Sequence, residues 1–268
     1  MTRILGVDFS GASDAGRKIW IAEGARTGNG ALSLSSCVAA IDLPGGGMPP
    51  DVAVPALARH IASLGRARVG CDFPFGLPRD LVAARTWRSF ALRYAAEFAD
   101  AHSFRAIMRS RHDAVEHKRR TDVTAKTPFN SYNLRLFRQT WWGISGVIGP
   151  LVRAGRAIVR PQQKLVDGKP VLIEVCAACT LKSIELYPPY KGRRPEHRRA
   201  RARILGHFVD RGALAAPTRR LRRLILDNEG GDALDAVIGA VATAHADLAV
   251  EADAHQRLEG RVYFEIGV

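Results

Sequence analysis

Short apolar runs separated by polar turns fill the first forty residues, and this pattern is typical of strands. The run that ends at Asp8 predicts a first strand over residues 3–8. Two further apolar runs, residues 18–22 and 31–38, flank a Gly-Asn-Gly turn, and such a turn predicts a β-hairpin. The chain therefore begins with three predicted strands, of which the second and third are antiparallel.

The pattern then changes to a helical period. After Asp51, apolar residues recur three and four positions apart up to residue 64, which predicts a helix with Asp51 as its N-terminal cap. A short apolar run over residues 68–72 follows and ends at Asp72, before a Phe-Pro stop, so we expect another strand there. A strand joined through a helix to the next strand implies a mixed sheet that contains a parallel pair.

The remainder of the chain is mainly helical in pattern. Residues 78–156 show helical periodicity and no domain linker. We therefore expect a single domain over residues 1–268, whose sheet carries a mainly helical, basic insertion at about residues 78–165. One more strand is predicted at residues 170–175, and a last helix of high apolar content at residues 231–249.

Composition adds charge to this picture. The chain has 268 residues, of which 47% are hydrophobic, so it can bury a sizeable core. Its formal net charge of +14 favours a polyanionic partner such as nucleic acid, a nucleotide or an acidic surface, although an arginine-rich host composition would give the same excess. No apolar run reaches the roughly 20 residues of a membrane span, and Asp8 comes too early for a signal peptide, so we expect a cytoplasmic protein with no membrane contact. Nothing in the sequence sets its oligomeric state.

The four cysteines are too few for a disulfide scaffold at this length. Cys176 and Cys179 have the CxxC spacing, but no second CxxC or nearby His-rich cluster completes a zinc set. We interpret this pair as two small buried side chains, with a redox or metal role as the alternative.

Four aspartates fall at positions that a parallel sheet would bring together. Asp8 and Asp72 each end a predicted strand, and the carboxyl ends of neighbouring parallel strands lie on one edge of a sheet, where α/β proteins place their sites. Asp232 and Asp235 are three residues apart in the opening turns of the last helix, so they share one face of it. If that helix begins near the same edge, the four carboxylates converge.

Converging carboxylates require a cation. Two like charges about 4 Å apart repel by about 4 kcal/mol at an effective dielectric constant near 20, and hard divalent cations remove this repulsion by taking oxygen ligands. The pattern therefore predicts a Mg²⁺ or Mn²⁺ site at Asp8, Asp72, Asp232 and Asp235. Each aspartate also has a simpler interpretation. An aspartate at the end of a strand often only forms a turn, and Asp232 could be a helix cap. A cap does not explain Asp235, which lies inside an apolar helix.

Glu174 is a fifth candidate because it interrupts an otherwise apolar strand. It has two interpretations. The carboxylate either assists the metal site or forms an ion pair with an arginine at the sheet edge.

Three segments, in this order along the chain, resemble segments of ribonuclease-H-like enzymes: Gly6-Val7-Asp8, the strand end Val69–Gly76, and Asp232–Ala242. The last segment looks like the closing helix of Holliday-junction resolvases. The whole set is more similar to the domain-of-unknown-function 429 family, described as predicted ribonuclease-H-like nucleases. Two further stretches, Ile173–Ala178 and Tyr190-Lys191-Gly192, extend the resemblance over most of the chain.

The resemblance implies an α/β fold with a ribonuclease-H-like mixed five-stranded sheet flanked by helices and a large, mainly helical insertion. It also implies that Asp8, Asp72 and Asp235 are the core metal ligands, with Asp232 and Glu174 assisting. The sequence departs from the family pattern at Cys176-Ala177, where the family often has an aromatic residue or His followed by Pro.

Three functions fit these residues. The first is a metal-dependent nuclease that hydrolyses phosphodiesters by a two-metal mechanism with Mg²⁺ or Mn²⁺. The second is a nucleotide-binding protein of the actin and sugar-kinase kind, in which the turn after Asp8 would hold ATP phosphates, although no second Gly-rich phosphate loop follows. The third is a non-catalytic protein that binds nucleic acid on the same fold.

Candidate contacts to a nucleic acid combine cations with amides and aromatic residues. Arg119, Arg120 and Arg135 lie in such mixed stretches, and Lys191 lies in the Tyr-Lys-Gly stretch. Mixtures of this kind suit phosphate contact and base stacking.

Overall fold

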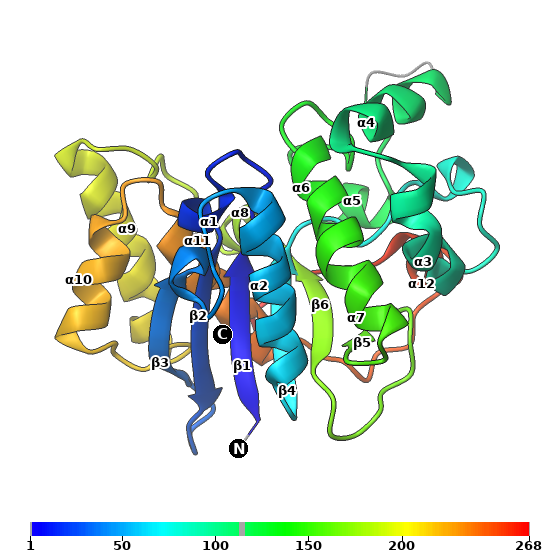
Figure 1. Cartoon of the computed structure of the whole chain (residues 1–268). Helices are drawn as coiled ribbons and strands as arrows, with labels where there is room; N and C mark the ends of the chain where they lie inside the picture. The colour runs from blue at the N-terminus through cyan, green and yellow to red at the C-terminus, as the bar shows by residue number, and fades with distance from the viewer. Residues whose placement is uncertain (1, 113–115, 268) are drawn as a thin grey trace.

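A mixed sheet of seven strands forms the centre of the structure over residues 2–112 and 116–267, the part of the chain that the computed structural model describes (Figure 1). The strands are β1 (Arg3–Asp8), β2 (Trp20–Arg26), β3 (Leu32–Ala39), β4 (Ala67–Asp72), β5 (Ile158–Val159), β6 (Val171–Val175) and β7 (Val262–Tyr263). The expected α/β class is confirmed.

The strand order is β3-β2-β1-β4-β6. β2 is antiparallel to β1 and β3, whereas β1, β4 and β6 are parallel neighbours. β4 pairs along one edge of β6, so the two-residue strands β5 and β7 share the other edge, β5 at its beginning and β7 at its end. The sheet therefore has two strands more than the five expected, because a two-residue strand leaves no periodic pattern in a sequence.

Helices and helical turns connect these strands and cover both faces of the sheet. They are α1 (Ala15–Lys18), η1 (Ala40–Asp42), α2 (Pro50–Ser63), η2 (Arg79–Leu81), α3 (Trp87–Glu97), α4 (Ala101–Ser110), α5 (Arg120–Thr124), α6 (Phe137–Trp142), η3 (Gly143–Ile148), α7 (Gly149–Arg153), α8 (Ala177–Ser183), α9 (Pro195–Asp210), α10 (Arg219–Asp227), α11 (Asp232–His245) and α12 (Gln256–Glu259). None of the helices in the described ranges combines the length and the apolar character needed to cross a bilayer.

The insertion expected at residues 78–165 is mainly helical, and it ends with the short strand β5. Residues 113–115 of this segment lie outside the described residues. The expected cap of α2 was wrong: Pro49 occupies the N-terminal cap, and Asp51 is the second residue of the helix, where its charge favours the positive end of the helix dipole.

Side chains alternate between the two faces of the sheet and so create two cores. Leu5 and Val7 of β1 pack in the core that α2 covers, whereas Ile4 packs in the core that contains α11. Figure 1 shows α2 in front of the sheet and α11 behind it. Twelve of the fourteen residues of α11 are buried, and a helix that is apolar all round is expected to be central in a fold.

Glycines let α11 lie directly on the sheet. A Cβ atom added at Gly6 of β1 would overlap the backbone of Ala236 and Ala240, and one added at Gly70 of β4 would overlap the Thr243 hydroxyl. Gly239 on the helix side is different, because its nearest neighbour would be a Val175 methyl group at 3.4 Å. The two strand glycines therefore set how closely α11 approaches β1 and β4.

Replacing Gly6 by alanine should lower the free energy of unfolding by about 3 kcal/mol or more, because the helix backbone must move away from the sheet. Gly239→Ala is the matched control. It adds the same methyl group where there is room and removes a helix glycine, so its stability should stay within about 1 kcal/mol of the parent. Urea denaturation of both variants measures the difference, and equal stabilities would refute the packing argument.

Candidate functional site

Asp8 and Asp72 end neighbouring parallel strands at the same edge of the sheet. They are register partners, as are Gly6 and Gly70 two residues earlier. Because side chains on a strand alternate with period two, each aspartate points to the same face as the glycine two residues before it, which is the face that α11 covers.

The helix α11 runs from this edge toward the opposite one. Its first turns carry Asp232 and Asp235, its middle crosses β1 at Gly6, and its end lies over β4 at Thr243. Asp235 is 4% exposed, although it is an acid. The four aspartates predicted from the sequence are therefore brought together where β1 and β4 end and α11 begins.

A cavity of about 280 Å³ opens at this point, and we call it the aspartate cavity. The four aspartates are among its lining residues. Tyr190, Lys191, Cys176 and Ala177 line it from the segment after β6. Phe129 and Gln139 line it from the helical insertion, which thus contributes to the same cavity as the sheet.

Asp235 has partners for both of its oxygens. The Tyr190 hydroxyl donates to Oδ1 at 2.6 Å, and the Lys191 ammonium lies 2.7 Å from Oδ2. Asp72 is held more loosely, because the Ala177 amide is 3.5 Å from its Oδ2. The Gln139 side-chain amide donates to the Asp72 backbone carbonyl and ties α6 to the end of β4.

Burial and crowding shift the titration of these carboxyls. Burial raises the pKa of Asp8 well above its usual range, and the Asp235 charge adds to this shift. The same two causes raise the pKa of Asp72 to about 7. The pKa of Asp232 is also raised, mainly by burial. Burial disfavours the Lys191 ammonium, but attraction by Asp235 and Asp8 outweighs it and raises the pKa of Lys191.

Glu174 also lines the aspartate cavity, but its carboxylate is paired with an arginine and makes no contact with the four aspartates, which corrects its expected assisting role. It is the register partner of Cys71, one position before Asp72, and therefore points to the other face of the sheet. There Arg119 donates to both of its oxygens, at 2.5 and 2.8 Å, and the Phe75 amide donates to Oε2 at 2.9 Å. The structure agrees with the second interpretation, an ion pair with an arginine.

Arg119 was expected to contact nucleic acid; it lines the aspartate cavity, but all of its side-chain donors are taken by protein partners, which argues against that contact. The side chain is 1% exposed, and its guanidinium donates to Asp122, Glu174 and the Glu259 carbonyl. A fully buried cation with these partners has no donor left for a phosphate. Its role is to join the insertion to β6.

The other three expected contacts differ in position. Arg120 is exposed and lines a different cavity, together with His255, from the one that the aspartates line. Arg135 is exposed, and its guanidinium lies 5.3 Å from the ring centre of Phe129, which lines the aspartate cavity. Lys191 lies in the cavity itself.

Cys176 and Cys179 form a disulfide bond, which corrects the expectation of two separate buried side chains. Cys179 is buried, whereas Cys176 is partly exposed and lines the aspartate cavity at the beginning of α8.

The sequence analysis did not predict the hydrogen bond between Tyr190 and Asp235. The one signal for it was that Tyr190 directly precedes Lys191, which was already a candidate site residue. The i,i+3 spacing of Arg119 and Asp122 could likewise have indicated a local ion pair.

Arg119→Ala should cost about 3–5 kcal/mol of unfolding free energy, because it leaves Glu174 and Asp122 buried without their cation. The exposed neighbour supplies the control: Arg120→Ala should change stability by less than about 0.5 kcal/mol. Urea denaturation gives both values. A stable Arg119→Ala protein with weakened nucleic-acid affinity would restore the contact role rejected above.

The aspartate pKa values also predict how stability depends on pH. Asp8, Asp72 and Asp232 bind protons more tightly in the folded chain than in the unfolded chain, so their contribution is present at low pH and is lost as pH rises. Without divalent metal, the unfolding free energy should therefore fall between about pH 4 and pH 7.

Asp72→Asn should remove part of this fall and should be more stable than the parent at pH 8, in EDTA, because it removes a charge from the cluster. Glu251→Gln, which changes an exposed loop acid, should keep the parent's pH dependence. Urea denaturation at pH 5 and pH 8 tests both variants. An unchanged pH dependence in Asp72→Asn would contradict the assignment.

In comparisons with protein-family models, curated proteins and solved structures, no match to this chain was found.

Proposed function

We propose that this protein is a metal-dependent nuclease that hydrolyses nucleic-acid phosphodiesters at the aspartate cavity. The observation that carries the proposal is the convergence of Asp8, Asp72, Asp232 and Asp235 at one sheet edge. Within residues 2–112 and 116–267, the one ion pair these four carboxylates make is that of Asp235 with Lys191. Asp235 is buried and the other three are half-buried, and carboxylates gathered in this way are costly to a fold unless they serve to bind a cation.

The donor set of the cavity fits a hard divalent cation. All four acids offer carboxylate oxygens, which are the ligands that Mg²⁺ and Mn²⁺ prefer. Asp8, Asp72 and Asp235 would hold the metal, with Asp232 assisting. A bound Mg²⁺ or Mn²⁺ would stabilise the charge on the transferring phosphoryl group and favour ionisation of the attacking water.

The protein's own groups prepare this site. The Tyr190 hydroxyl, 2.6 Å from Asp235 Oδ1, fixes the orientation of that carboxylate. The Lys191 ammonium offsets part of the negative charge while the cavity holds no cation, and its three donors also suit a phosphate oxygen. Because its side chain is 55% exposed, it can reach a substrate that approaches from solvent.

The sheet order supports a ribonuclease-H-like assignment of the fold. An antiparallel unit, β3-β2-β1, followed by the parallel strands β4 and β6 is the mixed five-stranded arrangement that the sequence resemblance implied. In that arrangement the first and fourth strands are adjacent, which is why Asp8 and Asp72 meet. The short strands β5 and β7 add to the outer edge without changing the central order.

A nucleic-acid substrate fits the charge of the surface. In addition to Lys191, exposed arginines lie on α9 and α10, at Arg199, Arg203, Arg219, Arg220 and Arg222. Arg135, stacked on Phe129 at the rim of the aspartate cavity, combines a cation with an aromatic ring as base-stacking sites do. A net charge of +14 makes binding to a polyanion strongly salt-dependent.

Purified protein should cleave labelled DNA or RNA with Mg²⁺ or Mn²⁺, and EDTA should stop it. Asp8→Asn should lower the cleavage rate by at least about 100-fold, because it removes a charge from the centre of the cation site. Glu251→Gln should cleave at the parent rate. Gel assays on single-stranded and duplex substrates measure both.

Circular dichroism of Asp8→Asn should match the parent, so that loss of cleavage is separated from loss of fold. Cleavage by folded Asp8→Asn at the parent rate would overturn the proposal. Thermal stabilisation by ATP, without nucleic-acid cleavage by the parent, would favour the nucleotide-binding alternative instead.

A further inference from the structure

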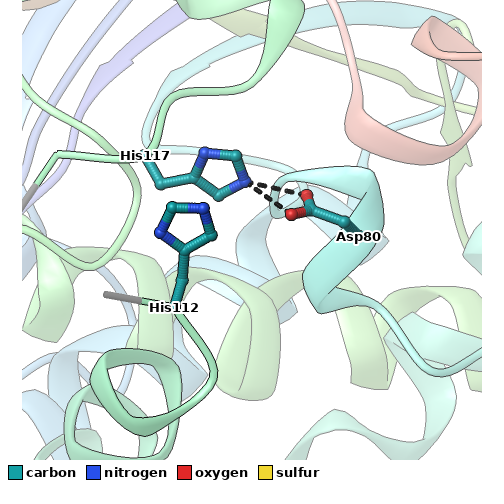
Figure 2. A group of neighbouring side chains, drawn as sticks. All are labelled: Asp80, His112 and His117. Atoms are coloured by element: carbon teal, nitrogen blue, oxygen red, sulfur yellow. Dashed lines mark hydrogen bonds and ion pairs between the residues drawn. The ribbon is translucent and has the colours of Figure 1, made fainter. Parts of the chain in front are cut away.

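Three side chains in the helical insertion form a second polar group, distinct from the aspartate cavity. Asp80 belongs to η2, His112 follows the end of α4, and His117 precedes the buried Arg119. Figure 2 shows the two imidazole rings stacked face to face, with the Asp80 carboxylate directed at the ring of His117. None of the three lines the aspartate cavity.

The ligand atoms of this group are close together. His117 Nε2 is 2.8 Å from both Asp80 oxygens, and the two imidazole rings are 4.0 Å apart and nearly parallel, at 8°. One ligand atom from each residue can be chosen so that all three lie within 4.8 Å of one another. An ion at about 2.0–2.1 Å from each ligand requires somewhat closer spacing. The two rings must also turn out of their parallel stack, because imidazole lone pairs lie in the ring plane and have to converge on one ion. The Asp80 side chain, which must move toward them, is 59% exposed.

Neighbouring residues hold the backbone at each of the three positions. Arg111, next to His112, donates to the carbonyl of Leu81, next to Asp80, at 3.0 Å. The amide of Arg79 donates to Glu259 Oε1 at 2.9 Å on the other side of Asp80. Lys118, next to His117, donates to the Thr127 carbonyl at 2.7 Å. The group is therefore exposed to solvent but supported on both sides, as a metal site requires.

We propose that Asp80, His112 and His117 bind a Zn²⁺ ion. Two imidazole nitrogens and one carboxylate oxygen form a donor set that zinc accepts, whereas Mg²⁺ prefers oxygen ligands alone. Solvent can complete a fourth position, because the group lies at the surface. The ion would join the segment after α4 to η2, two parts of the insertion that are about 30 residues apart in sequence.

Positively charged side chains near the three ligands lower the affinity for zinc, so both imidazoles are needed for tight binding. Arg79, Lys118 and Arg120 line a neighbouring cavity together with Asp80, His117 and the acid Glu259, and the excess of positive charge there opposes a cation. A single carboxylate with one imidazole would bind zinc weakly in such surroundings. Removal of any one of the three ligands should therefore weaken binding severely.

The test is calorimetric titration of the full chain with ZnCl₂. A background of Asp8→Asn with excess Mg²⁺ lowers zinc binding at the aspartate cavity, and any binding that remains there is not affected by substitutions at Asp80, His112 or His117. The protein should bind about one equivalent of Zn²⁺, and His112→Ala, His117→Ala and Asp80→Asn should each weaken binding by at least about 10-fold. The control His207→Ala, which removes a remote imidazole from α9, should bind as the parent does.

A second readout separates binding from folding. In the same Asp8→Asn background with Mg²⁺, zinc should raise the melting temperature of the protein with all three ligands and of His207→Ala but not that of His117→Ala, while all three should melt alike in EDTA. Zinc binding that survives each ligand substitution, or no zinc binding by the parent, would overturn the proposal. Neither result depends on nuclease activity, so this inference and the proposed function can fail separately.

Discussion

The structure depends on how closely α11 approaches the sheet. Gly6 and Gly70 lack the side chains that would keep the helix away, so its backbone rests on β1 and β4. This contact buries twelve of the fourteen residues of α11, and it also brings the acids of its first turns to the strand ends that carry Asp8 and Asp72. The packing of α11 and the candidate site thus have one cause. With larger residues in place of the two glycines, α11 would lie too far from the sheet for its carboxylates to meet those of Asp8 and Asp72.

The same closeness has an electrostatic cost. Carboxyl groups placed together away from water lose hydration and repel one another, so protons are retained up to unusually high pH. Tyr190 and Lys191 relieve part of this strain on Asp235. Under the proposed function, this loss of stability is the cost of keeping a cation site ready, a common balance at functional sites.

A second buried charge cluster serves a different purpose. Arg119 joins Glu174 of β6 to Asp122 of the insertion, and all three side chains are buried. Charges that are paired and hydrogen-bonded in this way fix one relative position of the parts they connect, since any displacement would leave a charge alone. The insertion can therefore contribute Phe129 and Gln139 to the aspartate cavity from a fixed position.

The sequence by itself determined the strands β1, β3, β4 and β6, the helices α2 and α11 and the positions of the four aspartates, because these depend on local periodicity and on where an apolar run ends. The tertiary structure decided what each charged side chain contacts. Glu174 and Arg119 pair with each other because strand parity and distant packing select partners that no short pattern encodes. The CxxC spacing of Cys176 and Cys179 is a short pattern, but their bond to each other was established only by the structure. No local pattern predicted that Asp80 lies close to His112 and His117, because Asp80 belongs to a different segment of the chain from the two histidines.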